Sequence, residues 1–269
     1  DYMMIAAILK ETTLGENRVA ATPKTVKELI KSGSTVRIQS EAGKASFSSD
    51  HDYIDAGAEV ISDISSLYNN VNIVLKVAPA TIAEIESFPN GTAYVSLMQT
   101  TRQCQQVQKL TEKNITGFSM HLIPRTTLAQ SMDALSSQAN ISGYKSVLVG
   151  ATHLPVYMPL LMTAAGTIPP AKVLILGAGV AGLQAIATAK RLGAQVESFD
   201  VRPEVKEQVE SLGAKFVEVA SDSDDGVGKG GYAKETSDDY KQRQQALIKE
   251  HIAKSNLVIT TALIPGRPA

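Results

Sequence analysis

The sequence predicts an α/β protein with two open, doubly wound parallel-sheet domains and a cleft between them. Short apolar runs alternate with helical segments along the chain of 269 residues, which is typical of strands separated by helices. A stretch dense in polar side chains, 124–138, interrupts the pattern. We therefore expect an N-terminal α/β domain over 1–136 and a second domain over 137–269, with ligands binding between them.

Composition excludes several classes of function. The 26 basic and 27 acidic residues give a net charge of −1, so we expect no nucleic-acid partner. Cys104 is the only cysteine and the four histidines are scattered, so we expect no disulfide and no metal site. No apolar run reaches 18 residues, which favours a soluble domain. Because the last apolar run, 257–261, predicts only a fourth strand of the second sheet, we expect this domain to be incomplete at its C-terminus.

The first domain should contain a parallel sheet covered by helices. We expect strands at 5–9, 35–39, 59–61, 72–77, 92–97 and 115–119, and helices near 23–32, 50–56, 81–87 and 101–113. Arg18 follows the first strand, and is either a bidentate clamp for an anionic group or a solvated loop residue. Lys76 ends a strand, where we expect a surface side chain with an apolar stem.

A long helix should open the second domain and run to about residue 162. Ser136, Ser137 and Asn140 are candidates to cap this helix. The following segment, 164–170, contains Gly166 and two prolines, so it should form a short connection.

The centre of the second domain is the run 173–183, which predicts a strand, a tight turn and a helix. Gly177 permits the turn, Gly179 leaves bare backbone for a pyrophosphate, and Gly182 lets the helix pack on the strand. Free N–H groups at the start of that helix would receive the phosphates. The alternative is a glycine-rich turn without a ligand.

An acidic residue in the right place supports the nucleotide interpretation. A second apolar run, 195–199, ends in Asp200, which lies 18 residues beyond Gly182 and can accept a hydrogen bond from a ribose 2′-hydroxyl. The pattern therefore predicts a Rossmann dinucleotide-binding domain. Asp200 would repel a 2′-phosphate and favour NAD(H), an effect that Arg202 would offset if it pointed at the ribose.

The stretch 221–240 lacks periodicity and follows a predicted helix at 203–212 and a strand at 215–219. Such a long segment inside an α/β unit is either a functional lid or disordered. Tyr232, preceded by glycines, is its best candidate to stack on a nucleotide.

Several motifs together resemble the alanine dehydrogenase and pyridine nucleotide transhydrogenase family, over the whole chain. They are Arg-Val-Ala-Ala-Thr-Pro at 18–23, Pro-Arg at 124–125, Ala-Gln-Ser-Met-Asp at 129–133, Ser-Ser-Gln at 136–138, Thr-Ala-Ala-Gly-Thr at 163–167, Gly-Gly-Tyr-Ala-Lys-Glu at 230–235 and Thr-Thr-Ala-Leu-Ile-Pro-Gly at 260–266. One departure is Thr127-Leu128, where relatives tend to carry a basic residue before the Ala-Gln pair.

The resemblance assigns roles to particular residues. It places Arg125, Gln130 and Asp133 in the catalytic loop over the nicotinamide, together with Ser136. It implies that the rest of the nucleotide is held by Gly177, Gly179, Val180, Gly182, Asp200, Val201, Arg202, Gly231, Tyr232, Gln244 and Leu263.

Ser96 decides between the two activities of the family. Alanine dehydrogenase uses a histidine after a Tyr-aliphatic pair as its acid/base, whereas Tyr94-Val95 is followed here by Ser96, although Arg18 and Lys76 match its substrate-binding residues. Hydride transfer between two nicotinamides needs no acid or base. The resemblance thus implies a transhydrogenase component that binds NAD(H).

That component would pass hydride between NADH and NADP⁺ held on a separate domain, beside a membrane domain that moves protons. The family further implies a homodimer on the bacterial cytosolic or organellar matrix side of a membrane. The alternatives are an alanine dehydrogenase and a non-catalytic NAD-binding module.

Overall fold

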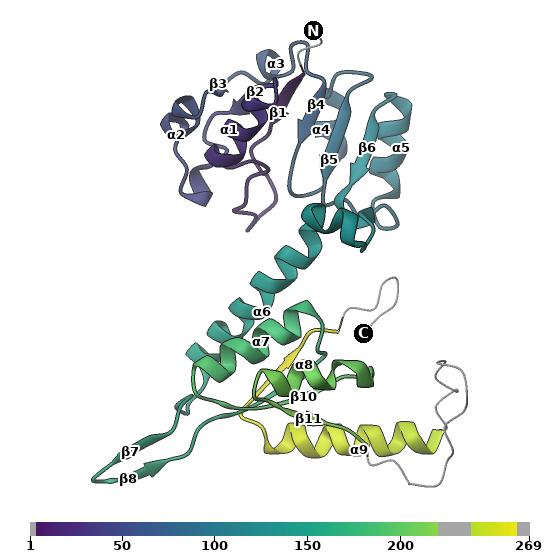
Figure 1. The fold of residues 1–269 in the computed structure, drawn as a ribbon. Helices are drawn as coiled ribbons and strands as arrows, with labels where there is room; N and C mark the ends of the chain where they lie inside the picture. Colours follow the sequence, from purple (N-terminus) through teal and green to yellow (C-terminus); the bar gives the residue numbers. More distant parts are fainter. Residues whose placement is uncertain (1–3, 220–237, 263–269) are drawn as a thin grey trace. The chain divides into compact units, whose positions relative to one another are not determined.

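The computed structural model describes residues 4–219 and 238–262, and the chain divides into two compact units, Asp1–Asp133 and Ala134–Ala269 (Figure 1). Each unit is built on its own parallel sheet with helices packed against it, which confirms the predicted α/β class.

The first unit contains a six-stranded sheet in the order β3-β2-β1-β4-β5-β6, in which every neighbouring pair is parallel. Its strands are β1 (Ile5–Ile8), β2 (Thr35–Gln39), β3 (Glu59–Ile61), β4 (Ile73–Leu75), β5 (Ala93–Ser96) and β6 (Thr116–Ser119). Strand order reverses beside β1, so the loops after β1 and β4 flank the switch point where open sheets bind ligands.

Helices cover both faces of this sheet. They are α1 (Pro23–Lys31), α2 (Asp50–Asp55), α3 (Ile64–Leu67), α4 (Ile82–Ser87) and α5 (Cys104–Glu112), with 3₁₀ turns η1 (Lys44–Ser46), η2 (Met120–Leu122) and η3 (Thr127–Met132). Successive strand side chains alternate between the faces. Ile8 therefore packs in the core with α1 and α2, whereas Ala7 packs with α3, α4 and α5.

The second unit contains a four-stranded parallel sheet in the order β11-β10-β9-β12. Its strands are β9 (Lys172–Leu176), β10 (Gln195–Phe199), β11 (Lys215–Val217) and β12 (Leu257–Thr260). Its helices are α6 (Ala134–His153), α7 (Val180–Arg191), α8 (Lys206–Ser211) and α9 (Asp238–Lys254), with a 3₁₀ turn η4 (Pro203–Val205). Val173, Ile175 and Ile186 are at most 1% exposed in the core between β9 and α7.

Helix α6 packs closely on α7 through a glycine. A Cβ atom on Gly143 would lie 2.0 Å from the carbonyl oxygen of Ala181, so the two backbones touch at this point. Only glycine fits there, and the contact places the middle of α6 against the first turn of α7.

Helix α6 corrects two predictions. It begins at Ala134, so Ser136, Ser137 and Asn140 lie within it and do not cap it. It ends at His153, well before residue 162, because Pro155 disfavours helical backbone at the residue before it.

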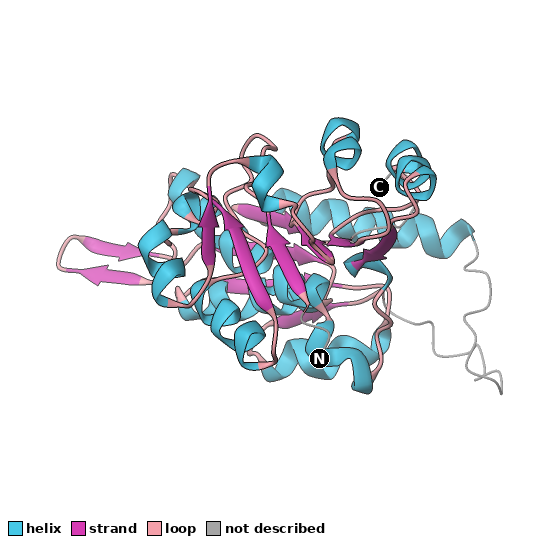
Figure 2. Cartoon of the chain, turned by 90° about the horizontal axis from the view of Figure 1, so that it is seen from above, coloured by secondary structure: helices cyan, strands magenta, loops and turns pink. Residues whose placement is uncertain are grey.

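A β-hairpin occupies the place of the predicted helix end and connection. Strands β7 (Leu161–Thr163) and β8 (Gly166–Ile168) pair antiparallel with each other and with neither sheet (Figure 2). All six strand residues are exposed.

Candidate nucleotide-binding site

The glycine turn has the geometry that the sequence predicts, between β9 and α7 in the second unit. Gly177 adopts φ +104°, in the left-handed region that side chains rarely adopt. A Cβ atom on Gly182 would lie 1.8 Å from the carbonyl oxygen of Gly177. These two glycines are therefore required for the turn and for the packing of α7 against it.

Gly179 is not required by packing in the same way. Its chain neighbours apart, no heavy atom of the described residues lies within 4 Å of the position that a Cβ atom would take on Gly179, and its φ of −77° suits any residue. It is the N-cap of α7, yet no side chain caps the helix. The turn thus leaves open space at the positive end of a twelve-residue helix, which suits an anionic group. Val180, in the first helical position, is 43% exposed there.

Asp200 follows β10 and connects the end of this strand to the glycine turn through a hydrogen bond. Its Oδ2 accepts a hydrogen bond of 2.7 Å from the backbone N–H of Ala178, and its side chain is only 6% exposed. Burial raises the pKa of Asp200, but hydrogen bonds from Arg202 and Ala178 outweigh this effect and hold the pKa below its usual value. The carboxylate is therefore ionised at neutral pH. Val201 is exposed beside it.

Thr261 supports the turn from the other neighbouring strand, β12. Its hydroxyl donates a hydrogen bond of 2.9 Å to the carbonyl oxygen of Gly177, and its N–H donates to the carbonyl of Leu176. We did not predict this role from the sequence. The signal was available, because the carboxyl ends of strands that flank β9 must lie beside the glycine turn.

The remaining predicted residues lie elsewhere or are not described. Gln244 is half-buried on α9. Gly231, Tyr232 and Leu263 lie outside the described residues.

Arg125, Gln130 and Asp133 belong to the loop that ends the first unit, and Ser136 lies in the first turn of α6. Ala129 is buried and anchors η3, while Arg125 and Gln130 are exposed on either side of it. The loop thus directs both of these polar side chains to solvent. Leu128, part of the Thr127-Leu128 departure from the family pattern, is 95% exposed.

Comparison with known proteins identifies the family. Residues 7–142 match the family described as alanine dehydrogenase/PNT, N-terminal domain, and residues 146–269 match its C-terminal domain. The chain belongs to the alanine dehydrogenase/PNT family.

Among its relatives, the chain is 43% identical to the first part of the NAD(P) transhydrogenase alpha subunit of Rhodospirillum rubrum, over 99% of this chain and 71% of that protein. It is 31% identical to an alanine dehydrogenase of Staphylococcus haemolyticus, over 78% of this chain and 56% of that protein. The crystal structure of a transhydrogenase from Sinorhizobium meliloti matches with a TM-score of 0.88 and 43% identity, over 98% of this chain and 71% of that one.

Of the helices in the described residues, not one is long and apolar enough to cross a membrane.

The alanine dehydrogenase/PNT fold brings three charged residues together in the first unit. Lys76, which we expected on the surface, has a fully buried side chain, so that prediction was wrong. Its Nζ lies 2.6 Å from Oε1 of Glu84 and 3.8 Å from Oε2 of Glu11. A buried ammonium group requires such partners. Glu84 follows Lys76 by eight residues and lies on α4, whereas Glu11 lies in the loop after β1. Arg18 is half-exposed and forms a bidentate ion pair with Glu16, with distances of 2.8 and 2.7 Å.

Ser96 ends β5 and is 1% exposed. Its neighbour on the same strand face, Tyr94, accepts a hydrogen bond of 2.7 Å from the N–H of Ala80, and burial raises the pKa of Tyr94 to about 12. Tyr94 is thus protonated at neutral pH and is poorly suited to accept a proton.

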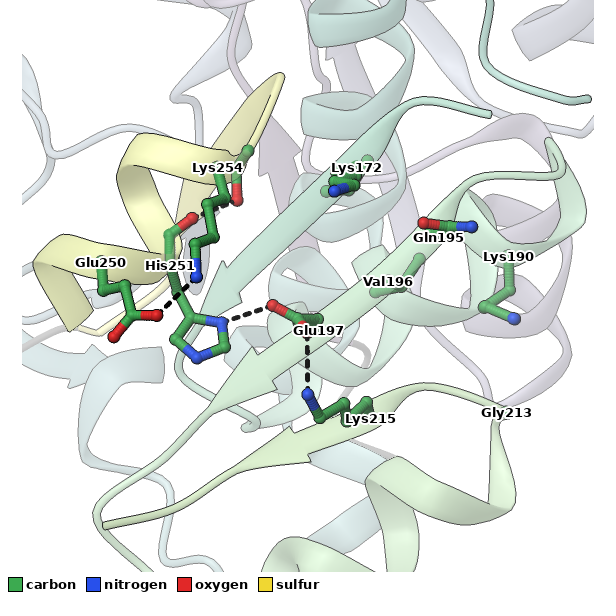
Figure 3. A pocket seen from close by; sticks show the side chains of 12 residues that line it. Lys172, Lys190, Gln195, Val196, Glu197, Gly213, Lys215, Glu250, His251 and Lys254 are labelled. Carbon is green, nitrogen blue, oxygen red and sulfur yellow. Dashed lines mark hydrogen bonds and ion pairs between the residues drawn. The ribbon is translucent and has the colours of Figure 1, made fainter. Parts of the chain in front are cut away.

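A cavity of about 520 Å³ lies at the amino-terminal edge of the second sheet (Figure 3). None of the site residues predicted from the sequence lines this cavity. Glu197 there lies 2.5 Å from Nδ1 of His251 and 3.3 Å from Nζ of Lys215. Lys190 and Lys254 belong to the last turns of α7 and α9, where a cation offsets the negative end of a helix dipole. The other two lysines of the lining, Lys172 and Lys215, lie on β9 and β11, so helix ends account for only part of its basic character.

Proposed function

We propose that this chain is the NAD(H)-binding component of a proton-translocating transhydrogenase, and that it passes hydride between NADH and NADP⁺ bound on a separate domain. The two family matches and the 43% identity to a transhydrogenase subunit support this proposal. Coupling to proton movement would belong to a membrane domain, with this chain on the cytosolic or matrix side.

The observation that carries the proposal is the open glycine turn beside an ionised, buried carboxylate. The space above Gly179 would receive a pyrophosphate, and Asp200 lies at the adjoining strand end, where a ribose would follow. A turn that served only packing would not need a bare position at Gly179. The residues present therefore fit a dinucleotide.

NAD(H), when bound, supplies the hydride from its nicotinamide ring. The contribution of the chain is to bind and orient it. The turn and the first N–H groups of α7 would hold the pyrophosphate, Asp200 and Arg202 the adenosine ribose, and Arg125, Gln130 and Asp133 the nicotinamide end. Gly231, Tyr232, Gln244 and Leu263 are proposed as further contacts on the basis of the family resemblance. No residue of this set has to exchange a proton with the reacting ring.

The exposed β7–β8 hairpin supports the proposal that the chain binds a second copy of itself. Met162 (71% exposed) lies on one face of a hairpin that pairs with no other strand described, and Ile168 (46% exposed), paired with Leu161 (37%), lies on the other face. Leu160, directly before β7, is 54% exposed. Such grouped apolar side chains are typical of an interface. We therefore propose a homodimer that buries this hairpin.

Reconstitution tests the proposal. The chain is mixed with an NADP(H)-binding transhydrogenase domain, and hydride transfer from NADPH to an acetylpyridine analogue of NAD⁺ is followed by absorbance. We expect turnover that requires both proteins. Nucleotide binding without turnover would favour a non-catalytic NAD-binding module, and absence of binding would reject the proposal.

Alanine dehydrogenase activity is the second candidate, favoured by the retention of Arg18 and Lys76. The same preparation is therefore assayed for NADH oxidation with pyruvate and ammonium. Because Ser96 cannot replace a histidine as proton donor at neutral pH, we expect no oxidation. Oxidation at a rate above that of the reconstituted hydride transfer would reverse the assignment.

A further inference from the structure

The guanidinium group of Arg202 is folded back onto Asp200. Arg202 Nε donates to Oδ1 at 3.0 Å and Nη2 donates to Oδ2 at 3.1 Å, which makes the ion pair bidentate. The backbone N–H of Arg202 donates a further bond of 2.9 Å to Oδ1. With the bond from Ala178, the carboxylate accepts four hydrogen bonds from the part of the chain that the structure describes.

These bonds fill the binding capacity of Asp200. A carboxylate offers about four acceptor positions, so a ribose hydroxyl must displace one of the present donors or share an oxygen with it. The Ala178 donor is backbone in the glycine turn, whereas the Arg202 donor is a side chain that is 50% exposed. Arg202 is therefore the donor that can leave.

The pairing also changes the charge that a nucleotide meets. A bare carboxylate repels a 2′-phosphate, whereas a carboxylate paired with a guanidinium presents almost no net charge. Once displaced, the guanidinium lies beside the ribose and can bind a phosphate through two parallel hydrogen bonds.

We propose that Arg202, through its bidentate pairing with Asp200, sets how strongly this site prefers NAD(H) over NADP(H). Because of this pairing, the preference of the site for NAD(H) over NADP(H) is weaker than an unpaired Asp200 would give. This inference rests on the proposed binding of NAD(H), and it adds the residue that controls nucleotide selectivity.

The test compares dissociation constants of the whole chain for NADH and NADPH, measured by nicotinamide fluorescence. In R202Q we expect the ratio of the NADPH dissociation constant to the NADH dissociation constant to rise about tenfold. The substitution removes the counterion of Asp200, and it also removes the guanidinium that would bind the 2′-phosphate. R191Q is the matched control, since it removes the same charge at the far end of α7, about 16 Å along the helix. It should leave the ratio unchanged.

D200N provides the opposite change. It removes the repulsion and frees Arg202, so the ratio should fall below that of the unmodified chain. Equal weakening of both nucleotides in R202Q, or an unchanged ratio in either R202Q or D200N, would overturn the inference while leaving NAD(H) binding intact. If the unmodified chain bound neither nucleotide, the proposed function would fail as well. Circular dichroism of each variant checks that it is folded.

Discussion

The hydroxyl of Thr261 donates a hydrogen bond of 2.9 Å to the carbonyl oxygen of Gly177, so the end of β12 holds the glycine turn in place. Asp200, at the end of β10, holds the same turn through the N–H of Ala178. The turn is thus fixed from both neighbouring strands. Preorganisation of this kind reduces the ordering cost of binding.

Replacing Thr261 by valine should loosen the turn with little change in shape. T261V removes one hydrogen bond to a backbone carbonyl, which we expect to lower the free energy of unfolding of the second unit by about 1 kcal/mol. NADH affinity should fall several-fold, while T261S, which keeps the hydroxyl, should bind almost normally. Urea denaturation and NADH titration measure the two effects. Equal affinity of T261V and T261S would contradict the role given to the hydroxyl.

Two glycines of the turn should respond differently to alanine. G182A places a methyl group against the Gly177 carbonyl oxygen and should destabilise the second unit by about 2 kcal/mol or more. G179A meets open space and should leave the melting temperature unchanged, but it should weaken NADH binding about tenfold by crowding the pyrophosphate. Calorimetry and NADH titration distinguish these outcomes. Normal NADH affinity in G179A would argue against a phosphate above this residue.

The buried charges around Lys76 predict a pH dependence of stability. Burial raises the pKa of Glu84, but the bonds from Lys76 and Thr81 outweigh it, so the pKa lies below its usual 4.5. Glu84 therefore stabilises the fold above pH 4.5, and this contribution is lost as the pH falls through the lowered value. In E84Q, the opening free energy of α4 and β5 should depend less on pH between about 5 and 3. Hydrogen exchange with mass spectrometry measures this opening free energy at each pH.

Glu11 supplies the control for this measurement. Burial raises its pKa, and the hydrogen bond from the backbone N–H of Val77 and the charge of Lys76 only partly offset that rise. Ionisation of Glu11 therefore lowers the stability of the fold, and protonation of Glu11 at acidic pH restores it. Because E11Q removes this gain, the stability of the variant should fall more steeply as the pH falls. An identical pH dependence in both variants would show that the cluster does not control the acid response.

The hairpin predicts the oligomeric state. M162D introduces a charge among the exposed apolar side chains of β7 and β8, and we expect it to shift the chain from dimer to monomer in light scattering. L14D is the matched control, because Leu14 is fully exposed in the first unit. A monomeric unmodified chain, or a dimeric M162D, would reject this face as the interface.

Local patterns predicted the glycine turn of the second unit and the elements on either side of it. Strand, glycine turn and helix follow one another over 172–191, and Asp200 directly follows the next strand, so spacing alone located them. Lys76 could not be placed in this way, because its partners Glu84 and Glu11 come from a helix and from another strand's loop. The end of α6 was missed although Pro155 signals it. The roles of Arg125, Gln130 and Asp133 stay predictions, since they depend on a bound nucleotide.

The contact between Gly143 and Ala181 has a mechanical consequence. Because α6 and α7 touch backbone to backbone there, a tilt of the first turn of α7 cannot be absorbed by side chains between them. Such a tilt would turn α6 about Gly143 as a lever, whose arm to Ala134 is about 14 Å long. A displacement at the N-terminal end of α7 would thus be passed along α6 to its first residue, Ala134.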